Sequence, residues 1–455
     1  MKPIKSFSFK IAVLLITFGS TAILYWFGFH KRFDAKYIPQ NADAIVMIDV
    51  KNVRNYFVFS FLKTPSQWSS TAFRINKKLD LYHFGIETPD YFAYFHLKNQ
   101  PITQWFTVAK IENETEFEQE VIKTHYIKEN LNNGMSSYYS KSMRLLFIKH
   151  LNQILISKIP ENQKAIAEKT AEDLFLKKLF LDAKKTEKTI DTNNAITLWI
   201  KKNSLLEEDG IINITLEKQE VVADGKLQLK SKYKKETTFS QNPNALLSFG
   251  FNFEMVHDLN ILKPHSIQIN KIIGFDLDSV FVHEPTKTEL VLNEIIEKKD
   301  SAISYDYDDD FNPIKKVIVH TSREPSFYFS MLTKDSQKVY TYLKTKKAID
   351  NHQIFVNFPL APTKTSIRNN ALTLEANLSK HNYLQTSQPK IGYLQVHFNK
   401  LEPKEWHYII GKNKNLEHFK SLEVLEINLT QENNLVHFQA RLKTKDQKSL
   451  IEVIK

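Results

Sequence analysis

The sequence contains no cysteine and little glycine. With no cysteine among the 455 residues, disulfides, thiolate nucleophiles, cysteine-based zinc sites and iron–sulfur ligation are all excluded. Only 10 glycines occur, and neither the phosphate-binding pattern G-x-x-x-x-G-K-[ST] nor the dinucleotide pattern G-x-G-x-x-G is present. We therefore expect no nucleotide site of these types and no cofactor.

The usual catalytic patterns are also absent. The chain has no G-x-S-x-G nucleophile elbow and no H-E-x-x-H motif, and its 15 histidines are scattered. We predict that the protein is not an enzyme, and we assign no catalytic, cofactor-binding, metal or other binding residue. A hydrolase with dispersed catalytic residues stays open as an alternative, because one sequence does not show which distant residues meet in the fold.

One acidic run resembles a cation-binding loop at first sight. It is Asp306-Tyr307-Asp308-Asp309-Asp310, and alternating carboxylates suit a hard cation such as calcium. Counted from Asp306, however, the positions that require Gly and Glu hold Phe311 and Val317. The run is better interpreted as a solvated hairpin end between two strands, so we predict no metal site.

The longest apolar run lies near the start, from Ile11 to Phe29, and contains no charged residue. A helix of this length covers roughly 28 Å, close to the hydrocarbon thickness of a bilayer. We predict a transmembrane signal anchor over 11–29. A signal peptide cleaved after Ala22 and a buried core helix are the alternatives, whereas a bacterial lipid anchor is excluded because it requires cysteine.

The flanks of this run give the expected orientation only weakly. Lysines precede the run, and Lys31, Arg32 and Lys36 follow it, so the positive-inside rule barely discriminates. We expect a short cytoplasmic tail at 1–10, a linker at 30–37 and a large exported part. This predicts a single-pass protein of the inner (cytoplasmic) membrane with most of its chain in the periplasm.

The net charge of +11 has two interpretations. It is consistent with contact to anionic lipid head groups, or it follows from a lysine-rich composition without a specific partner. The basic residues are spread along the chain, which favours the second interpretation. No nucleic-acid motif accompanies them, so nucleic acid is not an expected partner.

The rest of the chain has globular composition, 42% hydrophobic and 25% charged. Strand and helix patterns run through 38–235. They predict a buried strand over 44–50, a helix with an acidic first turn over 114–126 and an amphipathic helix over 161–181. A similar order restarts in 240–455. Ala195–Ile200 corresponds to Tyr393–Phe398, and Ile214–Lys230 aligns without a gap to Ile427–Lys443. We predict an α+β fold: two tandem, duplicated domains of antiparallel sheet with packed helices. Two unrelated stretches with similar strand patterns are the alternative.

The opening of the first predicted domain carries a resemblance. Tyr37–Val53 reads YIPQNADAIVMIDVKNV, and Lys443–Ile454 has a closing strand, polar turn and short apolar helix pattern. Both segments resemble uncharacterised, N-terminally anchored envelope proteins of Gram-negative, Bacteroidota-like bacteria. The chain departs from their lipoprotein members by lacking the lipidated cysteine. The resemblance implies export and carries no activity.

These observations lead to a functional hypothesis with two alternatives. We predict a membrane-anchored periplasmic protein with a non-catalytic interaction or scaffolding role, whose partners are the membrane and other envelope proteins. The first alternative is binding or transfer of lipid or another hydrophobic ligand, which the aromatic content favours. A large apolar groove in the structure favours that alternative, and filled cores count against it. The second alternative is the hydrolase described above.

Overall fold

The computed structural model describes residues 25–26, 28–31, 37–63, 65, 84–182, 194–252, 266–308, 311–378, 385–402, 405–406, 419–445 and 450. Its strands belong to one antiparallel sheet of 18 strands and to a separate pair formed by β11 and β17. By contacts the chain divides into two compact units. The first unit is Met1–Lys202, Asp209–Gly225 and Gln447–Lys455; the second is Asn203–Glu208 and Lys226–Asp446.

Strands dominate the described chain. They are β1 Ala42–Asp49, β2 Tyr91–Leu97, β3 Trp105–Lys110, β4 Ile127–Asn130, β5 Ser136–Ser140, β6 Leu145–His150, β7 Gln153–Lys158, β8 Ile196–Ile200, β9 Gly210–Leu216, β10 Glu220–Leu227, β11 Ser240–Gln241, β12 Leu247–Asn252, β13 Pro285–Tyr307, β14 Pro313–Thr333, β15 Lys364–Arg368, β16 Ala371–Ala376, β17 Gln385–Thr386, β18 Gly392–His397, β19 Leu422–Glu432 and β20 Leu435–Thr444. The helices are α2 Val50–Lys63, α3 Glu114–Lys123, α4 Lys164–Ala171, the π-helical η6 Glu172–Leu176, α7 Ser266–Ile273, α8 Leu277–Phe281 and α9 Ser336–Thr345, with short 3₁₀ turns between elements.

The predicted fold class is wrong. In place of two tandem α+β domains after a transmembrane helix, the structure is mostly antiparallel sheet, with one large 18-stranded sheet. The error has a physical cause, since alternating side chains identify a strand but do not reveal which strand edges pair. The domain bounds 38–235 and 240–455 stay a prediction.

The membrane anchor is also corrected. Among the described residues, no helix is long and apolar enough to cross a membrane. The predicted span 11–29 lies, apart from its last few residues, outside the described part of the chain. The structure therefore does not support the single-pass inner-membrane localisation.

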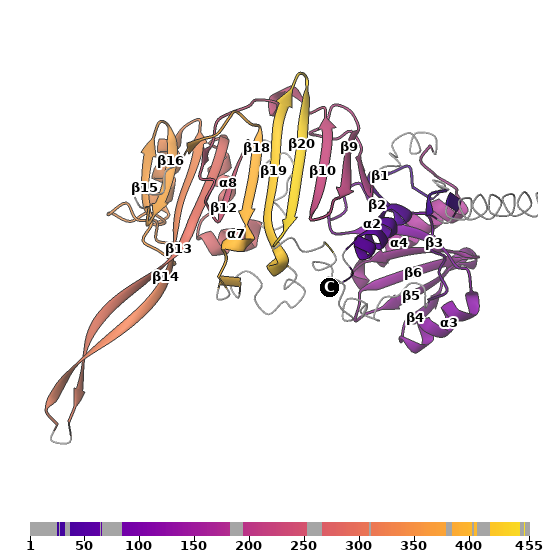
Figure 1. Cartoon of the computed structure of the whole chain (residues 1–455), viewed down its shortest axis with the longest axis horizontal. Coiled ribbons are helices and arrows are strands. Elements are labelled where there is room, and N and C mark those ends of the chain that lie inside the picture. The colour runs from indigo at the N-terminus through magenta and orange to yellow at the C-terminus, as the bar shows by residue number, and fades with distance from the viewer. Residues whose placement is uncertain are drawn as a thin grey trace, which may run out of the picture. The chain divides into compact units, whose positions relative to one another are not determined.

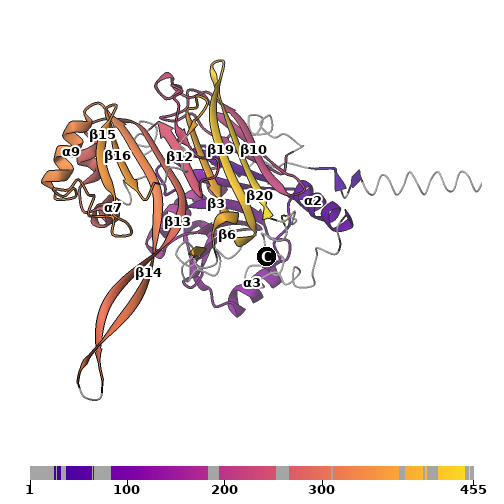
Figure 2. The same ribbon diagram turned by 60° about the vertical axis from the view of Figure 1, so that its left-hand side comes forward.

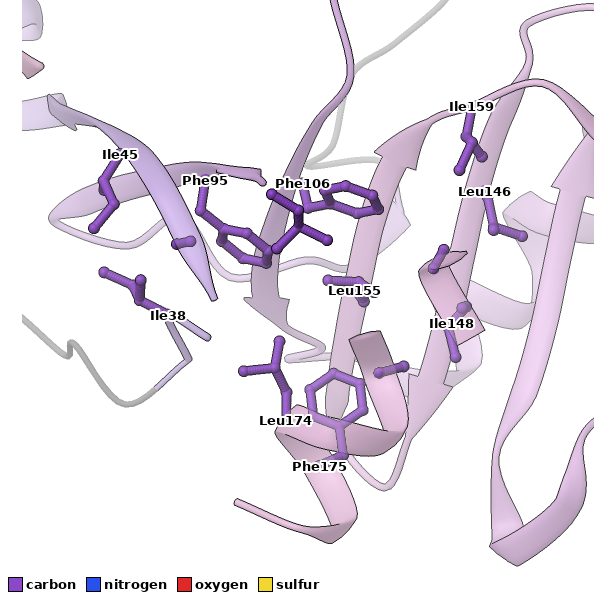
Figure 3. Close-up of a cluster of buried hydrophobic side chains, with 14 of the residues drawn as sticks. Ile38, Ile45, Phe95, Phe106, Leu146, Ile148, Leu155, Ile159, Leu174 and Phe175 are labelled. Atoms are coloured by element: carbon purple, nitrogen blue, oxygen red, sulfur yellow. The ribbon is translucent and has the colours of Figure 1, made fainter. Parts of the chain in front are cut away.

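The first unit pairs its strands in the order β9–β8–β1–β2–β3–β7–β6–β5–β4, all antiparallel. On one face of this sheet, α4 and η6 cover the strands. Figure 3 shows Leu174 and Phe175 lying against the strands that carry Phe95, Phe106 and Leu155. Phe95 and Phe106 stack with their ring centroids 5.8 Å apart.

A second cluster forms the core around α3. Phe117 and Val121 of this helix pack among side chains of the neighbouring strands and loops, namely Phe84, Ala109, Tyr126, Tyr138, Phe147, Ile154 and Ile156. The helix begins where the Asn113 side chain accepts a hydrogen bond from the Glu116 backbone N–H, at 3.2 Å. Helices therefore pack against two hydrophobic clusters in the first unit.

The second unit pairs its strands in the order β20–β19–β18–β12–β13–β14–β16–β15, again antiparallel. The order β19–β18–β12–β13–β14–β16–β15 matches β9–β8–β1–β2–β3–β7–β6 of the first unit, position by position. The two units thus share an order of strand pairings.

A long hairpin arm distinguishes the second unit. β13 and β14 stay paired from Pro285–Thr333 to Tyr307–Pro313, and beyond the neighbouring strands they continue as a twisted two-stranded ribbon (Figures 1 and 2). Several apolar side chains are exposed along this ribbon, among them Ile303, Tyr305, Val317 and Val319.

Candidate functional site: an apolar cavity in the second unit

A cavity of about 940 Å³ lies within the second unit. Its walls are β13, β14 and β16 on one side, and on the other α7, α8, α9 and the segment 355–363. Its volume is at the upper end of the roughly 300–1,000 Å³ that is typical of small-molecule sites. No local pattern in the sequence indicates this cavity, and none of its lining residues is among the predicted site residues.

The sheet side of the cavity follows from strand alternation. Every second residue of β14 lines it, from Thr321 through Arg323, Pro325, Phe327 and Phe329 to Met331. Because directly paired residues share a face in an antiparallel pair, their partners line it too. Phe329 lies opposite Leu290 on one side and opposite Leu374 on the other.

A bulge in β13 switches which of its residues face the cavity. The register shifts between Leu292 and Glu294, which leaves Asn293 out of the regular pairing. Before the bulge Leu290 and Leu292 line the cavity, and after it Ile295 and Glu297 do. One inserted residue thus changes which set of side chains faces the cavity.

The helical side is equally apolar. It is lined by Ile269, Ile273, Phe275, Leu277, Val280, Val339, Leu343, Phe355, Phe358 and Leu360. Side-chain caps stabilise the N-terminal ends of two of these short helices. Asp276 caps α8, accepting from the backbone N–H groups of Asp278 and Ser279 at 3.3 and 3.2 Å, and Asp335 caps α9 through the Lys338 N–H at 3.1 Å.

The end of α7 is tied to the segment that closes the cavity. The Asn357 side chain donates to the Ile273 carbonyl at 2.7 Å, which satisfies a free acceptor at the helix end. Gly274 follows with φ +77°, and a Cβ there would meet the Asn357 side-chain nitrogen at 2.6 Å. The backbone conformation therefore favours glycine here, and a larger residue would have to displace the Asn357 amide.

One end of the cavity is charged. Arg323 lies directly opposite Glu297 in the arm and forms ion pairs with Glu402 and, at 3.2 Å, with Glu405. The hydrogen bond to Glu402 is the main cause that raises the pKa of Arg323. Glu405 is only 4% exposed, so its ion pair with the guanidinium offsets part of the cost of burying the carboxylate.

A His–carboxylate pair occurs in the first unit, but the hydrogen bonds of its imidazole do not involve a nucleophilic side chain. His96 Nδ1 lies 2.7 Å from an oxygen of Asp43, and its Nε2 lies 3.1 Å from the Pro101 carbonyl. Both ring nitrogens are therefore engaged, and His96 is buried. This arrangement fixes a loop to the sheet, and it gives the hydrolase alternative no support.

The described part of the acidic run, Asp306 to Asp308, lies near the tip of the arm. Asp308 accepts hydrogen bonds from the Asn312 backbone at 2.7 Å and side chain at 3.2 Å, and Asp306 pairs with Lys316 at 3.5 Å. Asp309 and Asp310 lie outside the described residues. Over the part of the chain that is described, no group of three or more metal-ligating side chains comes together.

Comparisons with known proteins define no family for this chain. No family model matches it, and no curated protein matches it. Among solved structures, crystal form III of TP0453 is similar over 44% of this chain and 81% of that one, at 11% identity and a TM-score of 0.28. Crystal form I of TP0453 gives 44%, 80%, 11% and 0.27. This likeness is too weak to carry an argument, so the class rests on the structure: a mostly antiparallel β protein with an apolar cavity.

Proposed function

We propose that this protein binds an elongated hydrophobic ligand in the cavity of its second unit. The observation that carries the proposal is the combination of volume, about 940 Å³, with walls formed almost throughout by aliphatic and aromatic side chains. Ligand pockets are typically concave and apolar, with a few polar groups that set the orientation. Arg323, Glu297 and Glu405 are placed at one end to serve as such groups.

Incomplete burial of the walls supports the same proposal. Phe329, Leu374 and Phe355 line the cavity and are only half-buried. A ligand that covers them removes apolar surface from water, and each buried CH₂ group of the ligand contributes about 0.8 kcal/mol. A long alkyl chain therefore gains binding energy along its whole length.

The test is a titration with an uncharged fluorescent hydrophobic probe, N-phenyl-1-naphthylamine, against the wild-type chain and two tryptophan variants. Leu374→Trp places a bulky indole ring in the cavity and is expected to weaken binding at least tenfold. The ring overlaps with the space that the ligand occupies, so either the ligand or the cavity wall must move. Ile318→Trp is the matched control, because Ile318 lies on the arm and is 37% exposed.

The expected result is saturable binding to the wild type and to Ile318→Trp, and weak binding to Leu374→Trp. Circular dichroism of each variant shows whether the fold is retained. Equal affinity of all three proteins, or no saturable binding to the wild type, would contradict the proposal. The non-catalytic interaction role expected from the sequence stays a prediction, because no described feature identifies a protein partner.

A further inference from the structure

A second, polar pocket adjoins the apolar cavity. It measures about 480 Å³ and shares Ile295 and Glu405 with the cavity. The side chains that line it are otherwise mostly polar or charged: Asn242, Asn244, Asn293, Glu294, Lys400 and Glu402, with Leu246 beside them. An apolar hollow joined to a polar one has the layout that an amphiphile requires.

The bulged residue of β13, Asn293, lines the polar pocket and carries a buried donor. Asn293 is 6% exposed, and its side-chain oxygen accepts from the Asn242 amide at 2.8 Å. Among the described residues, its side-chain nitrogen has no hydrogen-bond partner. A buried donor without an acceptor is unfavourable, so an oxygen atom of a ligand in this pocket would relieve the cost.

The charges of the pocket are mixed. Glu402 and Glu405 share the guanidinium of Arg323, and Glu294 adds a further carboxylate. Lys400 brings one ammonium group, which donates to the Asn244 carbonyl at 2.6 Å. Three carboxylates against two cations disfavour an anionic group. Because Arg323 already neutralises much of the charge of Glu402 and Glu405, the attraction left for a cationic group is weak.

We propose that the ligand is an amphiphile whose alkyl chain occupies the apolar cavity and whose uncharged, hydroxyl-rich head group occupies the polar pocket. This inference rests on the proposed function. Hydroxyl groups both donate and accept, so they can bond the carboxylates and amide oxygens as well as the donors of Asn293 and Lys400. Ile295 and Glu405 mark the boundary between chain and head group.

The experiment compares probes with one chain and different head groups. Calorimetric titrations, below the critical micelle concentration, use n-dodecyl maltoside, n-dodecanol, dodecanoate and dodecyltrimethylammonium. The maltoside is expected to bind about tenfold more tightly than the other three, as one or two added hydrogen bonds would give. If dodecanol binds as tightly as the maltoside, or if dodecanoate or the ammonium probe binds best, the head-group inference is overturned while the proposed function stands. If no probe binds, both fail.

Two variants from separate elements that line the pocket sharpen the test. Asn293→Ala and Lys400→Met are each expected to reduce the preference for maltoside over dodecanol to about threefold or less, without weakening dodecanol binding. Lys338→Met on α9, where the lysine side chain is 71% exposed, is the matched control and keeps the full preference. An unchanged preference in both pocket variants would overturn the inference, and Lys400→Met preserves the test if Asn293→Ala folds poorly.

Discussion

The two units share an order of strand pairings but differ in what fills the space beside the sheet. In the first unit, the cluster against α3 is closed by side chains with almost no exposure, such as Phe117 and Phe147, both 0%. In the second, the corresponding strands β14 and β16 border a cavity of about 940 Å³. Strand order alone therefore does not decide whether such a sheet has a filled or a hollow core.

The difference can be located at single positions. In the β6–β7 hairpin Phe147 lies opposite Ile156, and at the same distance from the turn in β15–β16 Thr365 lies opposite Leu374. Phe147 also stacks on Tyr126 with the ring centroids 5.1 Å apart. A small hydroxyl residue thus stands where the first unit has a core aromatic ring.

The sharpest way to break the comparison is to truncate one side chain in each unit. Phe147→Ala should destabilise the protein by about 3–5 kcal/mol, because a fully buried ring leaves a cavity in a packed core. Leu374→Ala should cost less than about 2 kcal/mol, since this side chain is half-buried beside existing space. Urea unfolding followed by circular dichroism measures both. Equal costs would show that the second core is as well packed as the first.

A ligand should also distinguish the units. Bound at a free concentration of 100 times its Kd, it stabilises the folded state by about 2.7 kcal/mol. We expect slower hydrogen exchange in β14 and α9, which line the cavity, and little change in β5–β7. Hydrogen-exchange mass spectrometry with and without n-dodecyl maltoside provides the measurement. Protection confined to β5–β7 would place the ligand in the other unit.

Local elements were predictable where the signal is local. The helix expected from Glu114 begins there, because Asn113 caps it and Glu114 and Glu116 favour the helix dipole. The buried strand expected from Ala44 is β1, Ala42–Asp49. The long helix expected over 161–181 instead divides into α4 and a π-helical turn. The spacing of apolar residues does not reveal where the backbone hydrogen bonding changes from i→i+4 to i→i+5.

The sheet and the cavity were not predictable for a related reason. Alternation in β14 would be the same whether a filled core or a hollow lay beside it. The cavity depends on register, which places Leu290, Phe329 and Leu374 side by side, although they are far apart in the chain. It depends also on the bulge at Asn293, and one sequence gives neither. Predicting the charged end of the cavity would also require knowing that Glu405 pairs with Arg323.

The smallest expected effect contrasts one histidine from each unit. Both ring nitrogens of His96 are engaged. By contrast Nε2 of His397, at the end of β18, is buried and has no hydrogen-bond partner within the part of the chain that the structure describes. Burial, assisted by the nearby charge of Lys400, lowers the pKa of His397 below its usual value. As pH falls below about 6.5, the unfolded chain therefore takes up a proton before the folded one does. Stability should consequently fall across this window, while above about pH 7.5 the histidine contributes nothing.

Replacing His397 by glutamine, which does not titrate, should remove this part of the pH dependence. Urea unfolding of the wild type and of His397→Gln at about pH 7.5 and about pH 5 gives four free energies of unfolding. The wild type should lose more stability on acidification than the variant. Because other groups titrate equally in both proteins, the difference between the two losses isolates His397, and a difference of zero would mean that its imidazole is solvated well enough to protonate in the folded chain.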